Sequence, residues 1–518
     1  MSSTPWLSLL MLVPLVGAAL VAALPGRSSK TAKELALTFS LITLVIGVMA
    51  TAKYAAGGAQ FQLGEQHSWI PHFGVSYALG VDGIALVLVL MALVLAPVCI
   101  LAAWRDVPGG GRRESTYFAL LLVLETFMVG VFCATDVFLF YVFFEAMLIP
   151  VYFLIGLYGG PGRRGAAMKF LLFSLAGGLI MLVAVIALYL QGPGGADGFL
   201  LSKLSGLALN ETTERLLFVG FFIAFAVKAP MVPVHTWLPD AATEATPATA
   251  TLLVGVLDKV GTFGMIRFCL QLFPGASEWA TPVVVVLAVL SVVYGAVMAI
   301  GQTDIMRLIA YTSISHFGLI ILGIFSVTQL SWTGSVLYMV THGFSTAALF
   351  LFAAMLVRRH RTKRIGDYGG WQRVTPALAG IFLLAGLATV SLPGMAPFVS
   401  EFLVLAGSFG RHPVATGIVT TGVILAALYM FLLYKRVFTG PRPTTPGVNR
   451  VADLGTREKW VAAPILAVLL VLGVYPKPAL DLINPAVDTT LTQYVKTADP
   501  IPDHLVHLDA GVAEGSHP

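Results

Sequence analysis

The sequence carries little charge for its length. Of its 518 residues, 11% are charged and 57% are hydrophobic, whereas a typical soluble domain has roughly 25% charged residues. This shortage excludes a soluble enzyme, a nucleic-acid-binding protein and a disordered scaffold. The formal net charge of +5 in a membrane protein reports orientation rather than affinity for nucleic acid. The composition predicts an all-α polytopic membrane protein.

Cysteine is also scarce. Cys99, Cys133 and Cys269 each lie in an apolar run. The absence of a CxxC pair or a Cys/His ligand spacing argues against iron–sulfur clusters, zinc and disulfides. We expect the three thiols to be buried as small hydrophobic groups. We therefore expect no cofactor and no metal in this chain, so that any redox chemistry it serves takes place elsewhere.

Long apolar runs dominate what is present. A membrane-crossing helix needs about 20 mostly apolar residues, and this template predicts about fourteen spans. The first has no basic residue ahead of its apolar core, so we interpret it as a retained span rather than a signal peptide. The predicted spans are 4–25, 35–55, 78–103, 115–133, 136–157, 167–190, 216–237, 247–272, 282–301, 305–326, 332–357, 377–408, 414–438 and 460–476.

The connecting loops alternate in charge. Basic clusters follow the odd-numbered spans, near residues 27–33, 105–113, 163–169, 358–373 and 435–459. Because an excess of lysine and arginine marks the cytoplasmic side, we expect both termini to lie outside the cytoplasm. The acidic tail after Lys477 agrees with that orientation.

Several titratable residues interrupt the apolar runs, where a charge costs at least about 2.5–3.5 kcal/mol and usually marks an ion pathway. An internal salt bridge is the alternative for any one of them, but buried ion pairs are weak stabilisers. We interpret the loop residues His360 and His412 as solvated surface. The candidate site residues are Glu145, Lys228, Lys259, His316, His342 and Glu401, with Glu125, His235, Asp258 and Lys169 in support.

Two spans contain helix-breaking prolines beside these charges. Pro230 and Pro233 follow Lys228, and Pro393 and Pro397 precede Glu401. Interrupted spans recur where transporters build ion sites, since freed backbone groups line an aqueous cavity. A simple packing kink is the alternative.

The spacing of the titratable residues suggests an internal duplication. Glu145 precedes His316 by 171 residues. Lys169 precedes His342 by 173 residues, and Lys228 precedes Glu401 by the same number. The pattern predicts that the fourth to eighth spans recur as the ninth to thirteenth.

Chemically, these groups suit proton transfer. A carboxylate close to a buried lysine favours its protonated form, and withdrawal of that carboxylate favours release, so Glu145 and Lys228 form a candidate switch. Lysine and histidine can relay protons along the row, and Glu401 would exchange them at its far end. Water at the broken helices would link the groups.

Three stretches then resemble a known family. Residues 228–268 (KAPMVPVHTWLPDAATEATPATATLLVGVLDKVGTFGMIRF), 303–318 (TDIMRLIAYTSISHFG) and 391–402 (SLPGMAPFVSEF) are similar to the antiporter-like subunits of respiratory complex I. The resemblance implies fourteen transmembrane helices with two inverted five-helix repeats, each with one broken helix. It divides the chain into 1–113, a first repeat over 114–273, a second over 274–440, and a last helix with an exterior tail over 441–518.

The resemblance also implies roles. The family's essential glutamate falls on Glu145, its broken-helix lysine on Lys228, its central lysine on Lys259 and its central histidines on His316 and His342. Its exit residue falls on Glu401, where most relatives have lysine and one subunit type has glutamate. The chain also ends after the fourteenth span, without the long lateral helix of another subunit type.

The function implied is proton translocation, coupled to NADH:quinone electron transfer elsewhere in the complex. Flavin, iron–sulfur clusters and quinone are expected in other subunits. The expected partners are other membrane subunits, with two related antiporter-like subunits on either side, together with membrane lipids, protons and water, and no nucleic acid. The expected location is the bacterial cell membrane. Two alternatives remain: a subunit of a multi-subunit Na⁺/H⁺ antiporter, against which Glu401 speaks, and a structural subunit that moves nothing.

Overall fold

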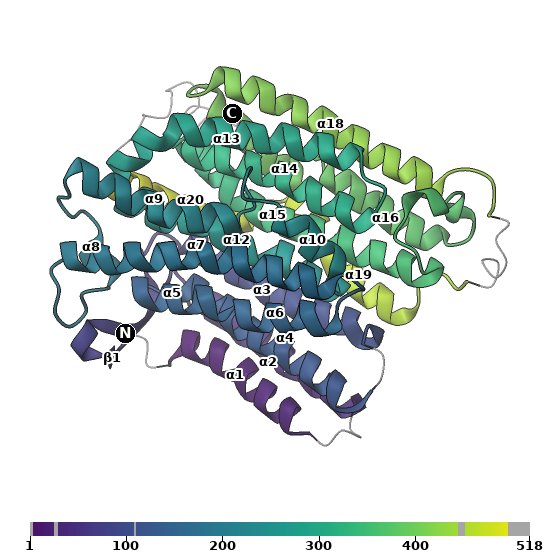
Figure 1. Cartoon of the computed structure of the whole chain (residues 1–518), viewed down its shortest axis with the longest axis horizontal. Helices are drawn as coiled ribbons and strands as arrows, with labels where there is room; N and C mark the ends of the chain where they lie inside the picture. Colours follow the sequence, from purple (N-terminus) through teal and green to yellow (C-terminus); the bar gives the residue numbers. More distant parts are fainter. Residues whose placement is uncertain (1–3, 25–28, 108–109, 444–450, 496–518) are drawn as a thin grey trace, which may run out of the picture.

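The computed structural model describes residues 4–24, 29–107, 110–443 and 451–495. Its helices lie side by side along the long axis of the molecule, with α1 and α2 at one edge and α18 at the opposite edge (Figure 1). The long helices are α1 (Trp6–Ala23), α2 (Ser29–Thr51), α3 (Gly83–Ala102), α4 (Gly111–Cys133), α7 (Arg163–Gln191), α9 (Glu211–Lys228), α13 (Pro274–Ile300), α14 (Ile305–Phe325), α15 (Gln329–His360), α18 (Pro413–Phe438) and α19 (Thr456–Val474).

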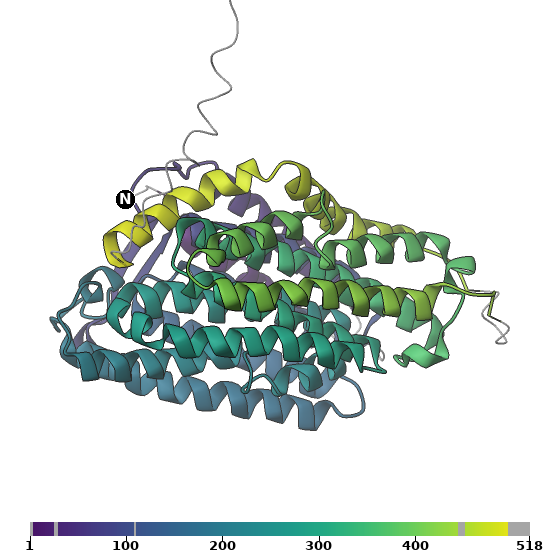
Figure 2. The same ribbon diagram turned by 90° about the horizontal axis from the view of Figure 1, so that it is seen from above.

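Shorter helices complete the bundle. They are α5 (Val137–Ala146), α6 (Leu148–Tyr158), α8 (Leu201–Leu204), α10 (Trp237–Glu244), α11 (Pro247–Leu252), α12 (Lys259–Gly264), α16 (Pro376–Thr389), α17 (Ala396–Phe409) and α20 (Lys477–Thr490). Seen from above, α20 runs along one face of the bundle (Figure 2), where it packs against α3 and α15. α20 bends by 70° from the end of α19.

The predicted helical membrane class is confirmed. Within the described residues, ten helices are long and apolar enough to cross a membrane, or up to eleven if the bent pair α19–α20 is one span. The other predicted spans coincide with α9, with the segment 247–270 and with the broken pair α16–α17. Fourteen spans and two repeats therefore remain a prediction with which the fold is consistent.

A small β-hairpin was not predicted. β1 (Gln62–Ile70) pairs antiparallel with β2 (Val75–Val81), and α3 begins only at Gly83, so the third span starts later than the predicted residue 78. The Asp82 side chain caps α3 by accepting a hydrogen bond from the backbone N–H of Ala85 at 2.9 Å. The hairpin also provides an acceptor for a backbone N–H group in the first turn of α1, because Glu65 accepts a hydrogen bond from the N–H of Leu7 at 2.8 Å.

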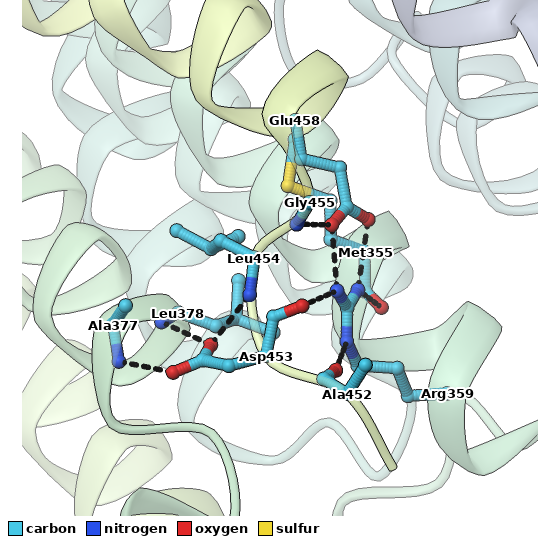
Figure 3. A network of polar contacts seen from close by, with 9 residues as sticks. All are labelled: Met355, Arg359, Ala377, Leu378, Ala452, Asp453, Leu454, Gly455 and Glu458. Atoms are coloured by element: carbon cyan, nitrogen blue, oxygen red, sulfur yellow. Dashed lines mark hydrogen bonds and ion pairs between the residues drawn. The ribbon is translucent and has the colours of Figure 1, made fainter.

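Loops with basic clusters meet at one end of the bundle. Arg359 at the end of α15 donates to both carboxylate oxygens of Glu458 in α19, at 2.9 and 2.6 Å, and to the carbonyl oxygens of Ala452 and Asp453 (Figure 3). Asp453 in turn accepts hydrogen bonds from the first N–H groups of α16. Charge-assisted hydrogen bonds therefore tie this end together. It is called the inner end below because its basic loops predict the cytoplasmic side.

His360 lies at the surface but not in a loop. It forms the last residue of α15 and is partly exposed. Its ring packs against those of Tyr368 and Trp371, with centroids 4.9 and 5.0 Å away. The helix extends further than the predicted residue 357 and carries the histidine into this aromatic contact.

Candidate functional site

The centre of the bundle contains a lysine–histidine pair. Lys259 Nζ lies 2.9 Å from Nδ1 of His342 and donates to the carbonyl oxygen of Val254 at 2.6 Å. His342 Nε2 lies 3.1 Å from the Thr346 hydroxyl. Both side chains are fully buried, so the pair connects the segment 247–270 with α15 away from solvent.

The backbone around Lys259 is irregular in a way that exposes polar groups to the pair. Two π-helical segments, Leu253–Leu257 and Met265–Leu270, flank the short helix α12. Such π-helical insertions are rare and occur frequently at functional sites. Asp258 lies between them, fully buried, and neither of its carboxylate oxygens has a hydrogen-bond partner among the described residues.

A hydrogen-bonded chain leads from the histidines to Glu401. The rings of His342 and His316 are 5.4 Å apart between centroids. His316 Nδ1 lies 2.5 Å from the Tyr338 hydroxyl, which donates to Oε1 of Glu401 at 3.2 Å. Tyr429 OH lies 3.3 Å from the other ring nitrogen of His316. These groups form a nearly continuous polar row through α14, α15, α17 and α18.

Glu145 and Lys228 are less directly connected. Lys228 Nζ is buried and has no hydrogen-bond partner among the described residues. Instead it lies 5.0 and 5.5 Å from the ring centroids of Phe144 and Phe170, where the ring faces attract the ammonium group. Electrostatic interactions link Lys228 to Glu145 and to Asp258. Lys228 thus lies between the partly exposed Glu145 and the central pair.

Both broken helices are interrupted as their prolines indicate. α9 ends at Lys228, and α10 resumes at Trp237 after a segment containing Pro230 and Pro233. α16 ends at Thr389, and Pro397 begins the first turn of α17, with Pro393 in the intervening turn. Lys228 therefore comes just before its break, whereas Glu401 comes one turn after its own.

Three of the four supporting residues lie apart from the row. Glu125 is buried against α2, where it accepts a hydrogen bond from Ser40 at 3.0 Å. His235 packs edge-on against Tyr294, with centroids 4.9 Å apart, and its two ring nitrogens have no hydrogen-bond partner among the described residues. Lys169 instead pairs with Asp240, at 2.7 Å. The structure brings Asp258 alone of these four beside the central groups.

Sequence reasoning missed Tyr338, Thr346, Tyr429 and Asp240. Tyr338 and Thr346 lie four residues before and after His342, so helical spacing places them on its face, and that spacing was an available signal. Asp240 bridges Lys169 of α7 and Arg307 of α14, with 2.7 Å to each. No sequence pattern indicated that bridge.

The row has the chemistry of proton transfer. Each member from Lys259 to Glu401 can hold or pass a proton, and hydroxyl groups both donate and accept hydrogen bonds. The described residues include no group of three or more His, Cys, Asp or Glu side chains able to hold a metal ion. The three cysteines are free and buried, as expected.

Comparison with known proteins identifies the family. Residues 134–428 match the family described as NADH:quinone oxidoreductase/Mrp antiporter, TM. NADH-quinone oxidoreductase subunit M of Mycobacterium tuberculosis is 50% identical, with 100% of both chains covered.

Solved structures agree with that comparison. A chain of respiratory complex I from Thermus thermophilus is 32% identical, with a TM-score of 0.85 over 94% of this chain and 99% of that one. A chain of the Mrp complex from Dietzia sp. DQ12-45-1b has a TM-score of 0.84 over 96% and 99% but is 22% identical, so it shows likeness of fold alone. The similarity to subunit M agrees with the subunit type that the resemblance implies for a glutamate at position 401. The chain therefore belongs to the antiporter-like membrane subunits of NADH–quinone oxidoreductase, respiratory complex I.

Proposed function

We propose that the row from Glu145 through Lys228, Lys259, His342 and His316 to Glu401 is the path along which this subunit translocates protons. The observation that carries the proposal is the direct contact between Lys259 and His342, 2.9 Å apart. Apolar contacts would stabilise the bundle better than a buried row of titratable groups, so their accumulation indicates a transport role.

Each group has a distinct part in the proposal. Glu145 controls the charge of Lys228, which exchanges protons with the central pair through water near Asp258. The histidines pass them by way of Tyr338 to Glu401, which releases them toward the outer side. Electron transfer from NADH to quinone takes place in other subunits, which hold the flavin, iron–sulfur clusters and quinone.

The assembly is part of the same proposal. Two related antiporter-like subunits flank this chain in a bacterial cell membrane, and both termini lie outside the cytoplasm. The residues after 495 that would form the acidic tail lie outside the described part of the chain. Residues 114–273 and 274–440 act as the two repeats, each supplying one broken helix.

A Na⁺/H⁺ antiporter function has weaker support. The likeness to the Mrp complex concerns the fold, and the centre of the row is built from nitrogen groups of Lys259, His316 and His342. Hard cations prefer oxygen ligands, so this centre suits protons better than sodium. Separately, the resemblance places lysine at the position of Glu401 in most relatives and glutamate in one subunit type of complex I, which speaks against an antiporter subunit.

Glu401→Gln tests the proposal. The amide keeps the size of the side chain but cannot carry a proton, so we expect proton uptake to fall by at least about tenfold in proteoliposomes containing the whole purified complex. Glu211→Gln, at an exposed position paired with Arg215, is the matched control and should leave uptake unchanged. Normal uptake in an assembled Glu401→Gln complex would favour a structural subunit.

A further inference from the structure

A second hydrogen-bonded group lies between the inner end and the central pair. The Tyr117 hydroxyl of α4 is 2.8 Å from that of Thr246, which is 2.8 Å from that of Thr249 in α11. All three side chains are buried. These three residues are called the hydroxyl column below. None of them belongs to the row from Glu145 to Glu401.

A small cavity lies beside Pro247, the residue that follows Thr246, and its mostly apolar lining includes a few charged side chains. The cavity, of about 10 Å³, has room for roughly one water molecule and is lined among others by Pro247, Asp106, Arg358 and Arg457. Asp106 follows the end of α3, pairs with Arg358 and acts electrostatically on Tyr117. Burial raises the pKa of Asp106 above its ordinary value, while the charges of Arg358 and Arg457 oppose that rise.

The other end of the column lies on the segment that contacts α15 beside His342. The segment 247–257 runs antiparallel to α15, because Pro247 lines a cavity with Leu351 and Arg358 whereas Gly255 lies at Gly343, where an added Cβ would come within 2.8 Å of the Gly255 carbonyl oxygen. Thr346 lies about one turn beyond Gly343 toward the inner end, and Thr249 precedes Gly255 toward the same end on its own segment. Thr346 contacts His342, so the proposed path from Thr249 to the central pair runs by way of Thr346 and requires water between the two threonines.

Local helix capping does not account for the column. Thr246 is the N-cap residue of α11, yet its side chain makes no capping hydrogen bond. Its hydroxyl is engaged by Tyr117 and Thr249 instead. Hydroxyl groups normally satisfy nearby backbone groups, as Thr251 does with the carbonyl oxygen of Pro247 at 2.8 Å. Three hydroxyls that bond mainly to one another form a connection between helices.

We propose that Asp106, Tyr117, Thr246 and Thr249 form the inner-side inlet that delivers protons to His342 and Lys259. This inference rests on the proposed function, because it feeds the same row. A proton leaving Asp106 is accepted by one hydroxyl oxygen, which passes its own proton onward. Each hydroxyl ends with the proton count with which it began, and only its orientation changes.

Removing single hydroxyls tests the inlet. Tyr117→Phe and Thr246→Val keep the packing but break the column, so we expect proton uptake by the whole complex in proteoliposomes to fall about fivefold, less than loss of a titratable group costs. Thr246→Ser restores the hydroxyl and should restore uptake. The rate of NADH oxidation by a soluble electron acceptor normalises proton uptake to the amount of complex present.

Two control variants remove neighbouring hydroxyls outside the column. Tyr158→Phe removes the Tyr158 hydroxyl, which donates a hydrogen bond to the backbone carbonyl of Arg113. The ring centroid of Tyr158 lies 4.9 Å from that of Tyr117. Thr251→Val changes the same helix as Thr246. Both should retain normal uptake. If Thr246→Val fails to assemble, Thr249→Val tests the same break one turn further along.

The outcomes separate the inlet from the row. Slow uptake in the column variants with normal controls supports the inlet. Normal uptake in assembled column variants, or an equal loss in the controls, overturns the inlet while the Glu401→Gln result still stands for the row. If Glu401→Gln is also without effect, the row and the inlet fall together.

Discussion

The two broken helices place their titratable groups in different surroundings. Lys228, before the break after α9, lies among aromatic rings with no hydrogen-bond partner among the described residues. Glu401, after the break before α17, accepts a hydrogen bond from Tyr338, which touches His316. The Lys228 side of the row lacks hydrogen bonds between its members and is called the open side below. The Glu401 side is already hydrogen-bonded and is called the connected side.

This difference suggests where control lies. A proton can pass along existing hydrogen bonds from His316 to Glu401, whereas Lys228 needs a rearrangement or water to exchange its own. Glu145 is only partly buried, so its charge is accessible to a change at the edge of the molecule. We infer that the open side sets the rate and that the connected side conducts.

The largest expected effect is on the open side. Glu145→Gln removes the charge that favours protonated Lys228, and Lys228→Met removes the proton carrier, so each should lower coupled turnover at least about tenfold. Because both residues act on one proton, the double variant should lose little more turnover than Lys228→Met alone. This non-additivity corresponds to a coupling energy of about 1–3 kcal/mol. Turnover of the purified complex measures this. Losses that simply multiply would show that the two residues act separately.

A smaller effect is expected for the hydroxyl group that joins the two titratable residues of the connected side. Tyr338→Phe removes the hydroxyl between His316 and Glu401, but a water molecule can bridge part of the gap, so we expect about a threefold to tenfold loss of proton uptake. Tyr434→Phe, which loses a 3.4 Å hydrogen bond to the backbone of Ala379, is the control. Equal rates in the two variants would contradict a conducting role for Tyr338.

The inner-end network should affect stability rather than transport. Arg359→Met leaves Glu458 without its guanidinium partner (Figure 3), and we expect a loss of about 1.5–3 kcal/mol in stability. Thermal unfolding of the complex checks this, with uptake normalised to assembled complex remaining near normal. A fall in normalised uptake without a change in unfolding temperature would place Arg359 on the transport path.

The smallest effect concerns the glycine beside Glu145. A Cβ on Gly178 would collide with the Glu145 carboxylate, so Gly178→Ala should turn that flexible group and lower turnover by about twofold to threefold. Gly165→Ala in the same helix meets nothing within 4 Å and serves as the control. Unchanged turnover in Gly178→Ala would mean that the position of the carboxylate is not critical.

The sequence was most informative where charge interrupted apolar runs. Those interruptions indicated Glu145, Lys228, Lys259, His316, His342 and Glu401, because burying a charge in a membrane is costly. The hairpin at 62–81 was missed because a window suited to long apolar helices absorbed the short strand β2 into the next span. Tyr338 and Thr249 were missed because hydroxyl groups cost little in such runs, and contacts between helices such as Thr246–Tyr117 are set by packing that no local pattern encodes.

Lys259→Met tests the central claim most directly, since Lys259 joins the open side to the connected side. Proton uptake and quinone reduction are measured together in proteoliposomes containing the whole complex, with the exposed Lys459→Met as the control. The account predicts that the Lys259→Met complex assembles but takes up protons at least about ten times more slowly, while the control is unaffected. Uptake and quinone reduction at the unmodified rates in an assembled Lys259→Met complex would contradict it.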